Sequence, residues 1–516
     1  MNALMEYILT HLVSGAVLLP LVGAAIVFAL PARAARGSRA VALAFCLASL
    51  ATSLIILFRV QGTGEIELID VLPWISSLGI SYRVGVDGVS ALMLSLVSFT
   101  AASSVLASWN DGRAGGKAYH VALLTGLCGL TGLFVSIDAF LFMVFWCVAM
   151  ASFCAMIGMG GERSAIKAAL AFAIFAAISG AAMFVSMAYA AKSAGSFDIL
   201  RWFSHRYGVN EQIWLFGGLA LAFGIILPLA GLHVWLRDSV MDSKAGTTMM
   251  LLGAVVKVGA YGFFRIAMPL APAAVSYFST AILVFAVAGA LYGAMLVIAG
   301  RDFKSVITAI TISQMGLVLL GLASLQDYAA AGAVLLMAAH GVALCGIVLL
   351  AGSLSSEAGD VAFRDFSGLA GRAPIAAFLM ALFSLALAGM PGLAGFAGES
   401  LLLMGSFQTR TAYSVAGLSA AALLACALAI KVAGSLFGEA ADDEGRLKGV
   451  HGWRLATLAV IATVVVGMGV WPGWLAGKVW RSSQAFVKLS KRVEMIVPAA
   501  AGEAGSSVVR SDGDDA

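Results

Sequence analysis

Long apolar runs separated by short polar stretches repeat along the whole chain. About 14 of these runs are roughly 18 to 25 residues long, the length that an α-helix needs to cross a hydrocarbon core of about 30 Å. This pattern predicts an all-α polytopic membrane protein with about 14 transmembrane helices. The predicted spans are 12–30, 39–58, 86–108, 119–136, 139–158, 165–190, 213–232, 245–266, 273–299, 303–323, 328–352, 374–406, 412–437 and 453–476.

Two of the predicted spans contain helix-breaking residues in their interior. The seventh carries Pro228 and Gly231, and the twelfth carries Pro391 among glycines between 389 and 398. Broken helices at corresponding positions of two halves are typical of transporters built from inverted repeats, with the ion site at the break. We therefore predict one repeat in spans 4–8 and a second in spans 9–13, with helices 7 and 12 broken. The alternative is that these residues only permit close helix packing, which is common in membranes.

The loops between the predicted spans are too short to hold a soluble domain. The apolar run that begins near Val13 is predicted to be a retained helix rather than a cleaved signal, because no basic segment precedes it and many more spans follow. The loop arginines favour an orientation with both ends outside the cell. The expected units are 1–118 with the first three helices, 119–270 and 271–440 with the two repeats, 441–497 with the last span and an interfacial helix, and 498–516 as a disordered tail.

Composition supports this class and excludes several others. Hydrophobic residues make up 61% of the chain, charged residues 11%, and the mean hydropathy is +0.99, which excludes a soluble enzyme. A net charge of +4 leaves no basic footprint for a nucleic-acid partner. The cysteines lie in apolar segments without the Cys-x-x-Cys spacing of metal or iron–sulfur sites. They are residues 46, 128, 147, 154, 345 and 426.

Two ionisable residues lie inside predicted spans, namely Lys257 in the eighth and Glu399 in the twelfth. A charged group at membrane depth costs at least about 2.5 to 3.5 kcal/mol, so its presence usually marks a pathway for ions or protons. Burial favours the neutral form of a lysine and of a carboxylic acid alike, which suits proton exchange near neutral pH. The alternatives are a Lys257 that extends to the membrane interface and a Glu399 at a polar helix end.

Several blocks of sequence, in order, resemble one membrane protein family. They are GVDGVSALML (85–94), HVWLRDSVMDSKAG (233–246), LLGAVVKVGAYGFFR (251–265), DFKSVITAITISQMG (302–316), AGAVLLMAAHG (331–341) and GMPGLAGFAGESLLLMGSFQ (389–408). Together they resemble the antiporter-like subunits of proton-pumping NADH:quinone oxidoreductase, over about residues 70–440. A glutamate at Glu399, where the L and N subunits typically have lysine, resembles the subunit M type.

This resemblance implies a role for each matching residue. Lys257 would be the central lysine, His340 a linking histidine, and Glu399 the carboxylate that passes the proton out. A histidine exchanges protons near neutral pH without any help, although a buried core histidine is the alternative for His340. Lys431 in the thirteenth span is a further candidate near the exit, but a side chain that extends to the interface explains it better.

The chain also departs from the family pattern. Cys147 stands where the family has a glutamate, Ile226 where it has a lysine, and Gln314 where it has a histidine. The glutamate and lysine form an ion pair in the family, and losing both together avoids leaving one buried charge unpaired. The input half of the proton path is therefore in doubt. His233 and Trp235, which match the family's His-x-Trp, remain.

We therefore predict a proton-translocating subunit of a complex I-like oxidoreductase in a bacterial inner membrane. The resemblance implies L-like and N-like neighbours in the lipid bilayer, with NADH, FMN, iron–sulfur clusters and quinone bound in partner subunits and no cofactor or metal in this chain. A Gly-Lys pair at Gly116 has Asp111 where a phosphate loop needs its first glycine. The alternatives are a scaffold that no longer pumps, or a paralogue in a hydrogenase, a cation/proton antiporter or an ion-coupled uptake complex.

Overall fold

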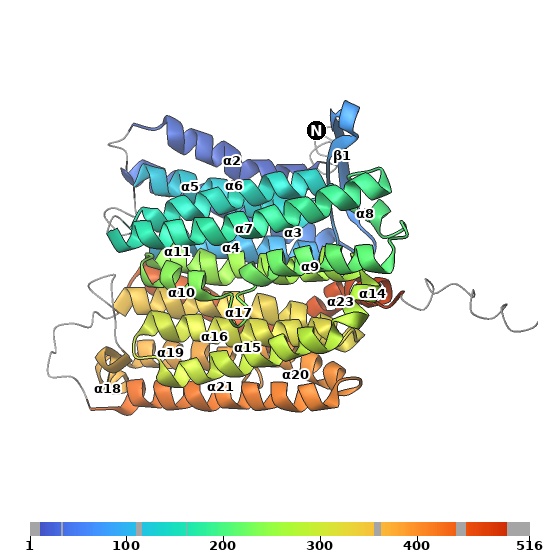
Figure 1. Cartoon of the computed structure of the whole chain (residues 1–516). Helices are drawn as coiled ribbons and strands as arrows, with labels where there is room; N and C mark the ends of the chain where they lie inside the picture. Colours follow the sequence, from blue (N-terminus) through green and yellow to red (C-terminus); the bar gives the residue numbers. More distant parts are fainter. Residues whose placement is uncertain are drawn as a thin grey trace, which may run out of the picture.

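The computed structural model of the chain describes residues 11–31, 35–109, 116–160, 163–354, 363–439 and 450–492. In this part of the chain, 13 helices are long and apolar enough to cross a membrane. They run side by side in one bundle (Figure 1). They are α2 (Leu12–Ala29), α3 (Ala35–Arg59), α4 (Gly88–Ala107), α5 (Lys117–Val135), α6 (Ala139–Gly158), α7 (Arg163–Ala194), α9 (Val209–Ile226), α11 to α13 (Ala245–Leu270) counted as one, α15 (Ser279–Ala299), α16 (Phe303–Ala323), α17 (Asp327–Leu354), α21 (Thr411–Phe437) and α22 (Trp453–Val470). With the broken twelfth span described below, they confirm the predicted set of spans.

Successive spans run in alternating directions, so the connections gather at two ends of the bundle. One end, called the hairpin face here, carries a β-hairpin together with α8 (Ile199–Trp202), α14 (Pro272–Tyr277) and α23 (Pro472–Ser490), towards the right of Figure 1. The other end, called the opposite face, carries α18 (Leu369–Arg372). The first described helix begins at the hairpin face, where α23 also lies.

The hairpin was not predicted from the sequence. Strands β1 (Glu67–Ile75) and β2 (Ile80–Val86) pair antiparallel, with Val71 opposite Arg83. The short turn η1 (Ser76–Leu78) joins them. The Arg83 guanidinium lies 2.5 Å from the Asp198 carboxylate, which ties the hairpin to the start of α8. The segment between the second and third spans is too short and too mixed in polarity to cross a membrane, so its sequence predicts no span there.

Aspartate side chains fix the starts of several helices. In each case the carboxylate accepts hydrogen bonds from backbone N–H groups of the first turn, which have no partner within the helix. Each of these aspartates directly precedes the helix that it caps. The caps are Asp87 for α4, Asp138 for α6, Asp198 for α8 and Asp302 for α16.

Both predicted broken helices are broken in the structure. The seventh span divides into α9 and α10 (Val234–Met241), and the twelfth into α19 (Pro374–Leu387) and α20 (Ala394–Phe407). Gly231 in the first break, and Gly389 and Gly392 in the second, have positive φ angles of 91°, 71° and 86°. Residues with a Cβ rarely adopt this conformation, so these glycines are needed for the breaks themselves.

The eighth span is irregular in a different way. Two π-helical segments, Leu251–Val255 and Phe263–Ala267, flank α12 (Val256–Gly262), which carries Lys257. A π segment carries an extra residue in its turn and is found often at functional sites.

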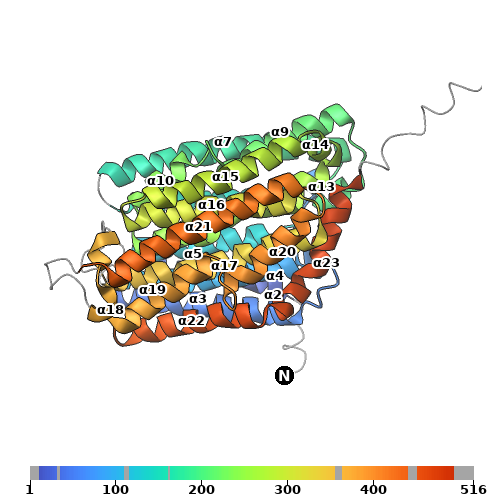
Figure 2. The same cartoon turned by 90° about the horizontal axis from the view of Figure 1, so that it is seen from below.

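The middle of the bundle is formed by four spans that are shielded from the surroundings. The most apolar stretches of α16 and α17 are entirely buried, that of the eighth span is 94% buried, and that of α4 is 89% buried, compared with 17% for α22. Figure 2 shows α16 and α17 between the outer helices. A polar group on one of these four spans must therefore find its partner inside the protein.

The predicted interfacial helix is α23, which crosses helix ends at the hairpin face (Figure 2). Its Phe486 ring stacks on Phe264 of the eighth span with centroids 4.6 Å apart, and its Trp480 ring lies 4.8 Å from that of Tyr328. Its N-terminal part continues from the last span through Pro472. The tail predicted to be disordered, residues 498–516, lies outside the described residues.

Candidate proton-transfer site

Lys257 is fully buried at the centre of the bundle. Its ammonium donates a hydrogen bond of 2.6 Å to the backbone oxygen of Leu252, which belongs to the π segment just before it. The same nitrogen lies 2.7 Å from Nδ1 of His340 on α17. Lys257 therefore does not extend to an interface, and the structure brings two of the predicted site residues into contact.

His340 links Lys257 to a hydroxyl on a third helix. Its Nε2 lies 3.2 Å from Oγ1 of Thr311 on α16, and that hydroxyl donates to the backbone oxygen of Ile307 at 2.8 Å. Because the hydroxyl hydrogen is used there, the oxygen accepts from Nε2–H of the imidazole. Nδ1 is then the acceptor that faces the ammonium, and this geometry fits a neutral histidine.

Gln314 continues the same line one turn along α16. Its Nε2 donates to the backbone oxygen of Leu387 at 2.5 Å and lies 3.4 Å from Oε1 of Glu399. Residues three apart on a helix lie on the same side, so Thr311 and Gln314 are neighbours. The result is a polar line, Lys257–His340–Thr311–Gln314–Glu399, across α12, α17, α16 and α20. All five side chains are at most 9% exposed.

The second break holds the Glu399 carboxylate at the end of this line. A Cβ on Gly389 would lie 2.0 Å from Oε2 of Glu399, so the break passes directly over the carboxylate. A Cβ on Gly398 would lie 2.6 Å from the backbone nitrogen of Leu336, so this glycine lets α20 pack closely on α17. The predicted break at Gly389 and the close helix packing at Gly398 are thus both present, while the ion site at the break stays a prediction.

In the described part of the chain, no comparable line starts at the first break. Ile226 is buried, whereas Cys147 is exposed on the surface of the chain. The expectation that both positions are buried is therefore wrong for Cys147. His233 accepts a 3.3 Å hydrogen bond from the backbone of Gly231 and packs on the ring of Tyr292. Among the contacts of the described residues, none joins His233 to Lys257.

Lys431 lies away from the polar line. Its ammonium donates a 2.6 Å hydrogen bond to the backbone oxygen of Gly300, the residue that ends α15 at the opposite face. The side chain therefore reaches a helix end, as expected for a lysine that extends to the membrane interface.

Sequence reasoning missed a largely buried ion pair on the hairpin-face side of Lys257. Tyr261 and Arg265 lie four and eight residues after Lys257, on the same side of the eighth span. The Arg265 guanidinium lies 2.6 Å from Asp87 and also contacts the hydroxyls of Tyr261 and Ser90. Burial raises the pKa of the Asp87 carboxyl, but Arg265 outweighs it and holds this pKa below the ordinary value. Asp87 and Arg265 stood inside two of the quoted sequence blocks, where a pairing between distant segments could not be read.

A second missed feature lies on the opposite-face side. The hydroxyl oxygens of four residues at the start of the eighth span and just before it are buried and have no hydrogen-bond partner in the described part of the chain. Elsewhere in the bundle, buried serines and threonines such as Thr131, Ser353 and Ser483 donate to a backbone oxygen one turn earlier. Buried polar groups nearly always have a partner, so these four require one, for which water is suited. They are Ser239, Ser243, Thr247 and Thr248.

The described residues contain no group of three or more histidine, cysteine, aspartate or glutamate side chains placed to hold a metal ion. The expectation that this chain binds no redox cofactor stays a prediction.

Comparison with known proteins gives consistent matches. The family model described as "NADH:quinone oxidoreductase/Mrp antiporter, TM" matches residues 136–425. NADH-quinone oxidoreductase subunit 13 of Thermus thermophilus is 33% identical over 423 residues, covering 81% of this chain and 88% of that protein. NADH-quinone oxidoreductase subunit M of Escherichia coli is 30% identical and covers 78% of this chain and 81% of that protein.

Solved structures agree at the level of the fold. A chain of respiratory complex I from Thermus thermophilus with bound NADH superposes with a TM-score of 0.85 at 29% identity, covering 93% of this chain and 99% of that chain. A chain of the Mrp complex from Dietzia sp. gives a TM-score of 0.80 at 19% identity, covering 94% and 99%, which supports the fold alone.

Proposed function

The chain belongs to the NADH:quinone oxidoreductase/Mrp antiporter family, and from that premise we propose that it is the proton-translocating subunit of a NADH:quinone oxidoreductase, of the subunit M type. The observation that carries this proposal is the polar line from Lys257 to Glu399 through a buried bundle centre. A proton path is the use that best explains ionisable groups at this depth.

The geometry supports proton transfer through His340. When Lys257 gives a proton to Nδ1, the imidazole can release the proton on Nε2 towards Thr311, which leaves the opposite tautomer. Gln314 has no ionisable proton, so it positions Glu399 and does not carry charge. Its Oε1 is buried without a partner in the described part of the chain, which suits a water molecule between Thr311 and Glu399.

Electrostatics favour one charge at a time on this line. Two like charges about 4 Å apart repel by roughly 4 kcal/mol at an effective dielectric constant of about 20. Lys257 and His340 lie closer than this, so a protonated Lys257 disfavours a second proton on His340. A proton that arrives at Lys257 therefore repels the proton that has already passed to His340, and pushes that proton on towards Glu399.

The input route does not depend on the family's ion pair, which this chain lacks at Cys147 and Ile226. We place it at the opposite face, along the unpartnered hydroxyls that lead to Lys257. Thr247 and Thr248 begin the eighth span, about two to three turns before Lys257. On the hairpin-face side the Asp87–Arg265 pair sits beside the same helix face, and we place the closed side of the path there because the Arg265 guanidinium is already bound by a carboxylate and two hydroxyls.

In this proposal the chain works only within its complex. L-like and N-like membrane subunits flank it in a bacterial inner membrane, and the redox cofactors NADH, FMN, iron–sulfur clusters and quinone belong to partner subunits. The groups at the two ends of the polar line, the Lys257 amine and the Glu399 carboxyl, can exchange protons but cannot carry electrons.

The test is Lys257→Met in the assembled complex, reconstituted into vesicles. The apolar side chain of similar length suits the helix, so the membrane arm should assemble while the number of protons pumped per electron falls. Lys117→Met is the matched control, because Lys117 donates to the backbone of Leu30 away from the line. A Lys257→Met complex that pumps as many protons per electron as the parent would remove Lys257 from the pathway.

A non-pumping scaffold is the second candidate, and the absent ion pair is the observation that favours it. The same measurement separates the two functions. A scaffold predicts that Lys257→Met and Lys117→Met leave the proton-to-electron ratio at the parent value, because neither residue would carry protons.

A further inference from the structure

Several lysines of this protein bind the C-terminal end of a neighbouring helix. Lys117 donates to Leu30 at the end of α2, Lys304 to Met241 at the end of α10, and Lys431 to Gly300 at the end of α15. Lys478 donates to Val60, just after α3. A cation at a helix C-terminus is stabilised by the unpaired carbonyls and the helix dipole. These lysines therefore cap helix C-termini.

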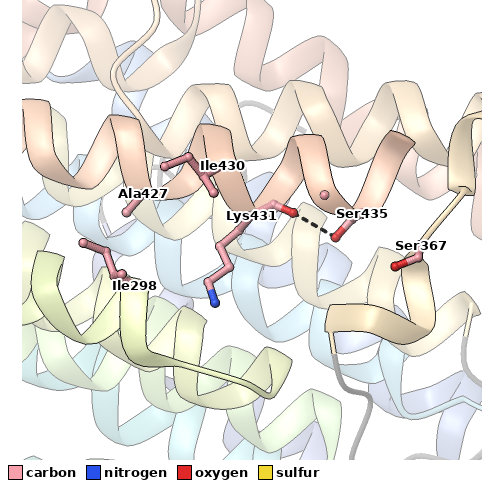
Figure 3. A pocket seen from close by; sticks show the side chains of 7 residues that line it. Ile298, Ser367, Ala427, Ile430, Lys431 and Ser435 are labelled. Atoms are coloured by element: carbon pink, nitrogen blue, oxygen red, sulfur yellow. Dashed lines mark hydrogen bonds between the residues drawn. The ribbon is translucent and has the colours of Figure 1, made fainter. Parts of the chain in front are cut away.

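Lys431 has a second feature, a cavity of about 300 Å³ beside its side chain. Figure 3 shows the Lys431 side chain running from α21 towards α15, with Ile298 on one side and Ser435 and Ser367 on the other. Ser435 donates its hydroxyl to the backbone of Lys431, whereas Ser367 lies on the short connection before α18. The cavity thus combines one cation with hydroxyl groups.

The position of the cavity matches the boundary between water and hydrocarbon. Gly300 ends α15, so the ammonium of Lys431 lies at the level of a helix end, and the exposed Arg301 follows directly. On the outer surface, Ile298 is 54% exposed and Ile430 is 72% exposed. The cavity therefore combines the Lys431 ammonium with apolar side chains that face the surroundings of the bundle.

We propose that this cavity binds the phosphate group of an anionic phospholipid. The Lys431 ammonium has three N–H donors and gives one to Gly300, so two remain for phosphate oxygens. Ser367 supplies a hydroxyl, and the acyl chain lies along Ile298 and Ile430. Basic pockets between membrane helices at the cytoplasmic side are suited to acidic lipid head groups.

This role differs from proton transfer, and it does not depend on the proposed function. Among the described contacts, none joins Lys431 to Glu399 or to the rest of the polar line. The lipid would fix the opposite-face ends of α15 and α21 relative to each other, because the two helices supply the ammonium and its carbonyl partner.

The test uses the assembled complex in vesicles that contain a photoreactive phosphatidylglycerol, with the labelled peptides identified by mass spectrometry. Label should map to the segments around Ile298 and Ile430 in the parent, fall severalfold in Lys431→Gln and persist in Lys431→Arg. Lys117→Gln is the matched control, since it removes another capping lysine and should leave this labelling unchanged.

Two further measurements test whether the ligand must be an anionic lipid, as opposed to a zwitterionic lipid or a free phosphate ion. A photoreactive phosphatidylcholine, which has no net charge, should label these segments much less. Excess inorganic phosphate should not compete with phosphatidylglycerol. Equal labelling of the parent and Lys431→Gln would overturn the proposal, and competition by inorganic phosphate would show that the ligand is a free anion and not a lipid.

Discussion

The two broken helices of this protein share a geometry but differ in chemistry. In the first break the indole of Trp235 donates to the freed backbone oxygen of Ile225 at 2.8 Å. In the second break the amide of Gln314 does the same for Leu387, but this amide also reaches Glu399. The indole N–H of Trp235 contacts only the freed carbonyl of the first break. The amide of Gln314 contacts both the freed carbonyl of the second break and the carboxylate of Glu399.

This difference shows that a broken helix and an ion site are separate features. Both breaks need a glycine with positive φ and a side-chain partner for a freed carbonyl. Only the second adds an acid, and among the described contacts only the second joins the line to Lys257, because His233 in the first break contacts Gly231 and Tyr292 instead. The first break meets the eighth span through backbone, since a Cβ on Gly259 would lie 2.5 Å from the nitrogen of Leu227. We therefore propose that the first break is structural in this chain and the second is chemical.

Glu399→Gln should have the largest effect on this comparison. The amide fits the same space and keeps a hydrogen bond with Gln314, but it cannot carry a proton. Pumping by the reconstituted complex should be lost although the complex assembles, as judged by subunit content after purification. Proton pumping at the parent ratio would show that the second break is as structural as the first.

Gly389→Ala and Gly231→Ala compare the two breaks directly. Both place a Cβ on a residue with positive φ, which costs on the order of 1 to 3 kcal/mol of stability. Only at Gly389 does the Cβ meet the Glu399 carboxylate, whereas at Gly231 it meets nothing within 4 Å. Thermal unfolding should shift for both variants, while the pumping ratio should fall only for Gly389→Ala. A loss of pumping in Gly231→Ala would give the first break a chemical role.

The double variant Thr247→Val with Thr248→Val tests the route that replaces the missing ion pair. Removing two unpartnered hydroxyls should slow proton uptake severalfold while the shape of the helix is kept. Thr131→Val is the control, because that buried hydroxyl already has a backbone partner. Uptake can be measured by a pH-sensitive dye during turnover. Equal rates in the double variant, the control and the parent would exclude this route.

Restoring the family's charges at the first break should have the smallest effect on pumping. Ile226→Lys buries an unpaired charge and should cost about 3 to 5 kcal/mol, whereas Cys147→Glu should cost little because position 147 is exposed. A coupling energy of about 1 to 3 kcal/mol in the double variant would show that the two side chains meet. Because only position 226 is buried, we expect nearly additive effects, and a higher pumping ratio would show that the parent input is impaired.

The spans and both breaks could be predicted because their signals are local. Run length identifies a membrane helix, and Pro391 with its neighbouring glycines identifies a break within one. Lys257 and Glu399 stood out because each is a charge within an apolar run. Such features need no knowledge of which helices are neighbours.

The order of the line could not be predicted from local signals. Thr311 looks like an ordinary helix threonine until α16 and α17 are packed and His340 lies beside it. The Asp87–Arg265 pair joins residues 178 positions apart, and the exposure of Cys147 follows only from the arrangement of the whole bundle. Packing between distant segments decides these contacts.

The claim that one break is structural and the other chemical can be tested with two matched substitutions. Trp235→Phe and Gln314→Met each remove the side-chain donor to the freed carbonyl of one break. In each case the replacement is an apolar side chain of similar size. The measurement is the number of protons pumped per electron by each reconstituted complex. We predict the parent value for Trp235→Phe and a clear decrease for Gln314→Met. Equal ratios in the two variants, or a decrease for Trp235→Phe alone, would contradict the account.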